Sequence, residues 1–185
     1  MKLTVILTST RPGRVGETVA DWFHGYATAH PAGFDIGFAD LKEVNLPLLD
    51  EPNHPALHKY EHAHTKRWSE IVASSDAFVF VLPEYNYTAP PSFINAVDYL
   101  YQEWNYKPAG FVTYGGVSGG IRSTETAKHL LTSVEMAPIK QQVMIPMVAK
   151  HLEDGVFKPT EIHEKSAQTM LDALARWAKA LKSMR

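Results

Sequence analysis

The sequence contains no cysteine, which excludes disulfides, thiolate zinc sites, cysteine-ligated iron–sulfur clusters and a cysteine nucleophile. It also has little net charge, −2 at pH 7, and no concentrated basic segment of the kind that binds nucleic acid. No apolar run approaches the roughly 18 residues that a membrane-spanning helix needs. We therefore expect neither a nucleic-acid partner nor a membrane partner.

The chain shows no long apolar signal region near Met1 and no small-residue cleavage site, which leads us to expect a cytoplasmic location. Its 185 residues, 45% of them apolar, can bury a substantial core. No linker, repeat or low-complexity segment interrupts them. We expect residues 1–185 to form a single domain.

Short apolar segments rich in β-branched residues alternate with helical patterns along the chain. This alternation predicts an α/β fold, in which a parallel sheet carries helices on both faces. The predicted strands are Leu3 to Thr8, Phe34 to Asp40, Ala77 to Leu82, Ala109 to Tyr114 and Ile139 to Ile145. A doubly wound five-stranded sheet of order 2-1-3-4-5 would bind its ligand beyond the carboxyl ends of the first and third strands.

Apolar residues at helical spacing lie between these strands. The stripes are Val19 to Tyr26, Leu57 to Val72, Phe93 to Trp104, Ala127 to Val134, and a last helix from about Glu161 to Leu181. The aromatic run Tyr99, Tyr101, Trp104 and Tyr106 suits either a subunit interface or the core.

The segment from Pro83 to Pro91 follows the third strand and is the strongest functional signal. Its tyrosines offer flat faces with polar tips, and its far end is stiffened by Pro90 and Pro91. Such a loop suits a flat, heteroaromatic, hydrogen-bonding ligand such as a flavin ring. An ordinary proline-rich turn whose tyrosines cover the core is the alternative.

The segment from Thr8 to Gly16 connects the first strand to the first helix. Hydroxyls, helix-end N–H groups and two arginines make a plausible phosphate cradle. It is neither a Walker loop nor a Gly-x-Gly-x-x-Gly dinucleotide fingerprint. A capped helix start with solvated arginines is the alternative.

Four glycines occupy the six positions from Gly115 to Gly120, after the fourth strand, and would let the backbone approach a ligand closely. The same segment matches the Gly-x-Ser-x-Gly nucleophile elbow around Ser118, and Asp154 and His163 follow in hydrolase order. The chain is short for that fold and has no glycine-rich oxyanion loop, so a serine hydrolase is a minor hypothesis.

A histidine cluster, His54, His58, His62 and His64, would place its first three members on one helix face. The intervening charged residues favour a solvated face instead, and we predict no metal site.

The three loops together resemble those of the NAD(P)H-dependent FMN reductase family, over nearly the whole chain. The resemblance implies a flavodoxin-like fold and bound FMN, with NADPH or NADH as co-substrate. It implies that the FMN phosphate contacts Ser9, Arg11, Arg14, Val15 and Gly16. It also implies that the flavin ring is lined by Pro83, Glu84, Tyr85, Asn86 and Tyr87, mainly through backbone groups, and flanked by Gly115, Gly116 and Ser118.

The resemblance further implies an oxidoreductase that passes hydride from NAD(P)H through FMN to a small acceptor, such as a quinone, an azo compound, a flavin or a metal oxyanion. No side chain is expected to act as a catalytic acid or base. Family members are typically dimeric or tetrameric. A flavodoxin-like electron carrier is the alternative on the same fold, although the near-neutral charge fits that role poorly.

Overall fold

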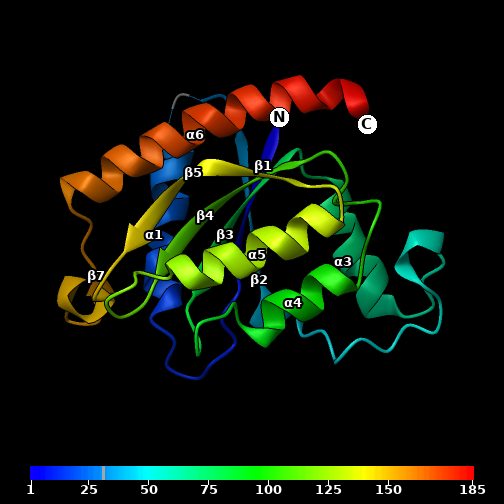
Figure 1. Cartoon of the computed structure of the whole chain (residues 1–185), viewed down its shortest axis with the longest axis horizontal. Helices are drawn as coiled ribbons and strands as arrows, with labels where there is room; N and C mark the ends of the chain where they lie inside the picture. Colours follow the sequence, from blue (N-terminus) through cyan, green and yellow to red (C-terminus); the bar gives the residue numbers. More distant parts are fainter. Residues whose placement is uncertain (31) are drawn as a thin grey trace.

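Five strands form the central sheet of the computed structural model, which describes residues 1–30 and 32–185. They pair in parallel in the order β2-β1-β3-β4-β5, which confirms the predicted doubly wound topology (Figure 1). The strands are β1 Lys2–Leu7, β2 Asp35–Asp40, β3 Ala77–Pro83, β4 Pro108–Tyr114 and β5 Ala137–Ile145.

The helices cover both faces of this sheet. Their bounds are α1 Gly16–Ala29, α2 Leu41–Val44, α3 Ala63–Ala73, α4 Pro91–Asp98, α5 Ile121–Ser133 and α6 Glu161–Leu181, with short 3₁₀ turns η1 Pro55–Leu57, η2 Val148–His151 and η3 Lys182–Met184. One core cluster lies between the sheet and α1 with α6, and the other between the sheet and α3, α4 and α5 (Figure 1). Every residue of β3 and β4 is buried, as central parallel strands require.

A small hairpin of β6 Leu152–Glu153 and β7 Val156–Phe157 interrupts the long connection before α6. Its turn residues Asp154 and Gly155 both have positive φ angles, 49° and 80°, as the Asp-Gly pair of a two-residue turn prefers. The hairpin is anchored to α1, because the Phe157 N–H donates to Thr18 Oγ1 at 2.8 Å.

Two predicted helices are shorter than their apolar stripes. The helix predicted from Phe93 to Trp104 ends at Asp98 as α4, and turns follow it, in which Asn105 Nδ2 donates to the Tyr101 carbonyl at 3.1 Å. Tyr99 and Trp104 are nevertheless fully buried, which assigns these two to the core. The stripe from Leu57 is broken by His58, whose φ of 52° ends η1, so that α3 begins only at Ala63.

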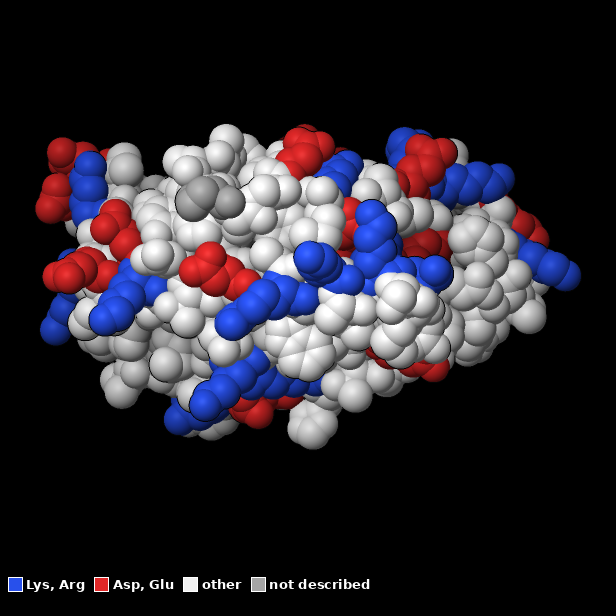
Figure 2. Space-filling model, turned by 90° about the horizontal axis from the view of Figure 1, so that it is seen from above, with Lys and Arg blue, Asp and Glu red and all other residues white. Residues whose placement is uncertain are grey.

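Acidic and basic side chains intermingle on the face shown in Figure 2, with no field of one sign. In residues 1–30 and 32–185, no helix has both the length and the apolar character to cross a membrane.

Candidate functional site

The loops after β1, β3 and β4 meet at one edge of the sheet, because these strands are parallel neighbours. Direct hydrogen bonds join the loops. Ser9 Oγ lies 2.8 Å from the Tyr85 hydroxyl, and the Glu84 N–H donates to the Tyr114 carbonyl at 3.2 Å. The structure therefore brings together the three segments that the sequence singled out.

The first loop presents a row of free backbone donors. Within residues 1–30 and 32–185, no acceptor is bonded to the N–H groups of Ser9, Thr10, Arg11, Gly13, Arg14 or Val15. The row leads into the first turn of α1, where further N–H groups lack helical partners. This arrangement suits a phosphate group.

The two arginines of this loop have different roles. Arg11 is exposed and forms no ion pair within the described part of the chain. Arg14 is held by Asp40 through both terminal nitrogens, one of them at 2.7 Å, and also donates to the Ser9 carbonyl at 2.6 Å. The hydrogen bond to Asp40 raises the pKa of Arg14 despite its burial. Arg14 thus fixes the loop to the end of β2, and only Arg11 has a guanidinium free for a ligand.

Gly16 is required by the protein itself. A Cβ atom built there would lie 2.2 Å from the hydroxyl oxygen of Tyr114, at the end of β4. Burial raises the pKa of that hydroxyl, and hydrogen bonds with Ser9 and the Gly16 N–H oppose the shift. Tyr114 was not predicted as a site residue, yet it joins the first and third loops.

The second loop contains a tight turn. Tyr85 and Thr88 exchange two backbone hydrogen bonds of 3.0 Å, and the residues between them, Asn86 and Tyr87, have φ angles of 49° and 70°. The left-handed region is costly for a tyrosine, and such strain concentrates at ligand sites. In the described chain, the N–H groups of Asn86 and Tyr87 donate to nothing, so they are available to a ligand.

Glu84 links the second loop to the third. Its side chain is 9% exposed, and its two oxygens accept from the backbone N–H and the guanidinium of Arg122, each at 3.1 Å. Burial raises the pKa of Glu84, but hydrogen bonds from Ser118 and Arg122 outweigh it, so the pKa lies below its ordinary value. The Arg122 guanidinium also stacks over the Tyr87 ring, 4.1 Å from its centre. Sequence reasoning assigned this loop to backbone contacts and missed the carboxylate's structural role.

The glycines of the third loop divide into two kinds. A Cβ at Gly119 would lie 3.0 Å from Pro146, and one at Gly120 would lie 2.6 Å from Thr113, so packing requires both. A Cβ at Gly116 would meet nothing within 4 Å, and one at Gly115 would make only ordinary contacts. These two glycines leave open surface beside the second loop, where a flat ligand can approach the backbone.

Ser118 has no histidine partner within residues 1–30 and 32–185. Its hydroxyl bonds to Glu84 and weakly, at 3.5 Å, to the Gly120 N–H. His163 instead accepts from the Thr160 N–H at 3.1 Å in the capping box of α6. The geometry gives no support to the serine hydrolase hypothesis, because an activated serine needs an adjacent base.

The histidine cluster does not form a shared helix face. His54 caps η1, His58 adopts a left-handed conformation, and His62 and His64 stack at the start of α3 with ring centres 5.2 Å apart. No group of three or more potential metal ligands occurs in the described residues.

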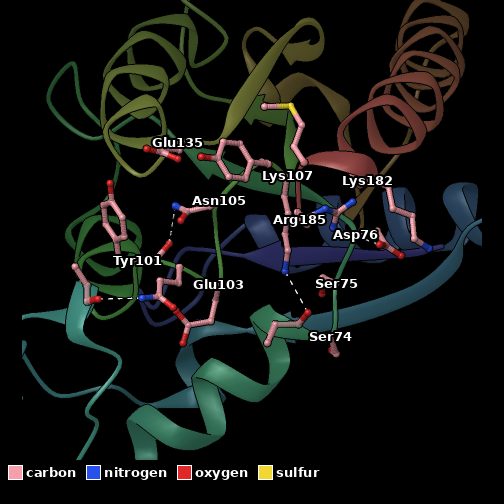
Figure 3. A pocket seen from close by; sticks show the side chains of 15 residues that line it. Ser74, Ser75, Asp76, Tyr101, Glu103, Asn105, Lys107, Glu135, Lys182 and Arg185 are labelled. Carbon is pink, nitrogen blue, oxygen red and sulfur yellow. Dashed lines mark hydrogen bonds and ion pairs between the residues drawn. The ribbon is translucent and has the colours of Figure 1, made fainter.

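The most voluminous of the cavities described here, about 850 Å³, lies at the opposite edge of the sheet (Figure 3). Lys107, at its wall, donates to the Val72 and Ala73 carbonyls at 2.9 and 3.2 Å and thereby caps the end of α3. Burial lowers the pKa of this lysine to about 8. Because this cavity lies at the opposite edge of the sheet, it is not part of the site built by the three loops.

These observations define a doubly wound α/β protein. At its switch point, the first loop offers free N–H groups to a phosphate, and beside it lie the strained turn of the second loop and the open glycine surface of the third loop. The model of the NADPH-dependent FMN reductase family matches residues 1–150. The chain therefore belongs to this family of flavodoxin-like oxidoreductases, whose cofactors are FMN and NAD(P)H.

Relatives agree with this assignment. The chain is 35% identical over 165 residues to the NAD(P)H-dependent FMN reductase ntnL of a Nectria species, covering 84% of this chain and 82% of the relative. It is 32% identical over 184 residues to the NAD(P)H-dependent FMN reductase C4B3.06c of Schizosaccharomyces pombe, with 98% and 91% covered.

Among solved structures, the flavoenzyme FerB, an NAD(P)H:acceptor oxidoreductase of Paracoccus denitrificans, superposes with a TM-score of 0.74. It is 22% identical, with 97% of each chain covered, and this likeness supports the fold.

Proposed function

We propose that residues 1–185 form one FMN-binding domain that transfers reducing equivalents from NAD(P)H to a small acceptor. The row of free N–H groups from Ser9 to Val15 carries this proposal, because it offers a phosphate monoester more donors than a side chain could. Arg11 adds a charge-assisted contact, while Arg14 positions the loop through Asp40.

The described residues fit FMN at the ring end as well. Asn86 and Tyr87 hold their N–H groups in a fixed turn, and Gly115 and Gly116 leave the neighbouring surface open. FMN, when bound, supplies the hydride chemistry. The residues of the chain orient it: Tyr85 bonds to Ser9, and Glu84 ties its own loop to Arg122. Pro83, buried at the end of β3, sets the point where this loop leaves the sheet.

We propose a quinone as the acceptor class. The 2-hydroxy-1,4-benzoquinone reductase of a Burkholderia species, 25% identical over 191 residues, supports this choice. A planar quinone suits the open surface at Gly116 and the exposed Tyr87 ring. An azo compound, a free flavin or a metal oxyanion would be reduced more slowly under this proposal.

Purified protein loaded with FMN tests the function directly. We expect a yellow protein with stoichiometric FMN that oxidises NADPH or NADH when benzoquinone is present. A protein that binds FMN but oxidises neither nucleotide would favour the electron-carrier alternative. The Ser118→Ala variant should keep quinone reduction, whereas an esterase activity lost in that variant would revive the hydrolase hypothesis.

We also propose that the protein is a homodimer or homotetramer located in the cytoplasm. Light scattering on the FMN-loaded protein would measure the subunit number. Fractionation of cells would test the location.

A further inference from the structure

A second cavity, of about 400 Å³, adjoins the first loop on the side of β2. It begins at Thr10, next to Ser9, and is bounded by α2 and by the start of α4, where Ser92 lies. Ser92 Oγ donates to the Thr8 carbonyl at 2.5 Å, which fixes this wall to the end of β1. The cavity is therefore continuous with the loops that we propose hold FMN.

The described lining of this cavity combines apolar side chains, uncharged polar side chains such as Asn45 and Asn95, and one cation. Leu41, Leu46 and Leu48 supply the walls, and Lys42 is the charged residue among them. Leu48 is 82% exposed, so its side chain is accessible to a ligand. A purine ring next to a phosphate group would match this lining.

Among the described residues, no carboxylate lines this cavity, which distinguishes it from two other cavities of the molecule. The 850 Å³ cavity includes Asp76 and Glu103, and a third cavity of about 710 Å³ beside α1 includes Glu17 and Asp21. An anion entering the 400 Å³ cavity thus meets a lysine without a competing acidic group in the lining.

The Lys42 ammonium has no ion pair or hydrogen bond in residues 1–30 and 32–185. Asp40, two residues before it, already accepts from both terminal nitrogens of Arg14 and from the Lys42 backbone N–H. Glu43 lines a separate cavity of about 310 Å³. A solvated lysine on a short helix is the ordinary explanation of such a residue, but the cavity beside it gives its charge a place to act.

We propose that this cavity binds the adenosine end of NADPH and that Lys42 recognises the 2′-phosphate, which distinguishes NADPH from NADH. The inference rests on the proposed function in that NAD(P)H is the reductant. FMN would bind to the free N–H groups of the first loop and to the second and third loops. The cavity next to Thr10 would then receive the adenosine end of NADPH, which is remote from the nicotinamide.

The test measures nucleotide binding apart from turnover. Adenosine 2′,5′-bisphosphate and adenosine 5′-monophosphate are each titrated calorimetrically into FMN-loaded wild type, Lys42→Gln and Lys42→Arg. We expect Lys42→Gln to weaken the bisphosphate about tenfold more than the monophosphate, as the loss of one charge-assisted contact implies. Lys42→Arg should restore most of that difference. Lys140→Gln, an exposed lysine on β5, is the matched control and should behave as wild type.

Steady-state kinetics give the second readout, in which the ratio of KM for NADPH to KM for NADH should rise about tenfold in Lys42→Gln. Equal bisphosphate affinity in wild type and Lys42→Gln would overturn the inference, as would displacement of the bisphosphate by excess FMN. If NADPH and NADH are both oxidised but the ratio of their KM values is unchanged, the inference fails and the proposed function stands. Lysine-dependent bisphosphate binding without oxidation of either nucleotide would retain the site and reject the function.

Discussion

Ser9 on the first loop and Tyr85 on the second share a hydrogen bond of 2.8 Å, although 76 positions separate them in sequence. The bond fixes the spacing between the phosphate-receptive loop and the tight turn at Asn86 and Tyr87. The two ends of the proposed FMN site are therefore preorganised relative to one another, which lowers the ordering cost of binding.

Tyr85→Phe should weaken FMN by about 0.5–1.5 kcal/mol, the usual worth of one neutral hydrogen bond. Fluorescence titration of FMN into the two proteins would measure the loss. Tyr87→Phe is the control, because the exposed Tyr87 hydroxyl bonds to no group in the described chain. Equal losses in both variants would mean that the Ser9 contact does not shape the site.

Replacing Arg11 with alanine should weaken FMN roughly tenfold to a hundredfold, as loss of a charged hydrogen bond to phosphate implies. Riboflavin, which has no phosphate, should bind both proteins alike. Arg14→Ala should instead lower the melting temperature, because Asp40 would keep a partly buried charge without its partner. An Arg11→Ala protein with unchanged FMN affinity would remove Arg11 from the site.

Glu84→Gln should destabilise the fold by about 1 kcal/mol at neutral pH, a modest value because Arg122 is half exposed. The pKa of Glu84 is lowered in the folded protein, so its contribution is complete above the ordinary value of 4.5 and disappears as the pH falls through the folded value. The difference in unfolding free energy between wild type and Glu84→Gln should therefore decrease as the pH falls below about 4.5. Urea unfolding across this range measures the difference, and a difference as large at pH 3 as at pH 7 would contradict the assignment.

His163→Gln should make the protein less sensitive to mild acid. Burial, aided by His151, lowers the pKa of His163 in the folded state, so wild type loses stability as the pH falls below the ordinary value of 6.5. Glutamine at this third position of α6 preserves the capping box with Thr160. Melting temperatures between pH 7 and 5 should fall less steeply in the variant, while His129→Gln, at an exposed position, should follow wild type.

The sheet was predictable because β1, β3 and β4 are short, mostly apolar segments, and their neighbour order then followed from the α/β alternation. The three loops were predictable for the same reason, since a strand's end marks its loop. The side-chain contacts within the site were not predictable. Asp40 pairs with Arg14 only because the register places it opposite Leu7, at the end of β1.

The reason for Gly16 was also hidden, because the Tyr114 hydroxyl that excludes a side chain there comes from a strand 98 positions away. The local sequence pattern around Gly16 does not indicate such a contact. The end of α4 was missed because the apolar stripe continues to Tyr99 and Trp104, which are buried although they lie beyond the helix.

The ion pair between Arg14 and Asp40 also connects ligand binding to the margin of the sheet. Among the described strands, β2 lies at the edge of the sheet beside β1, and its last residue holds the first loop. We therefore expect fraying of this edge and release of the loop to occur in a single opening event. A ligand that orders residues 9–15 should accordingly slow amide hydrogen exchange along Asp35–Asp40, at positions it never touches.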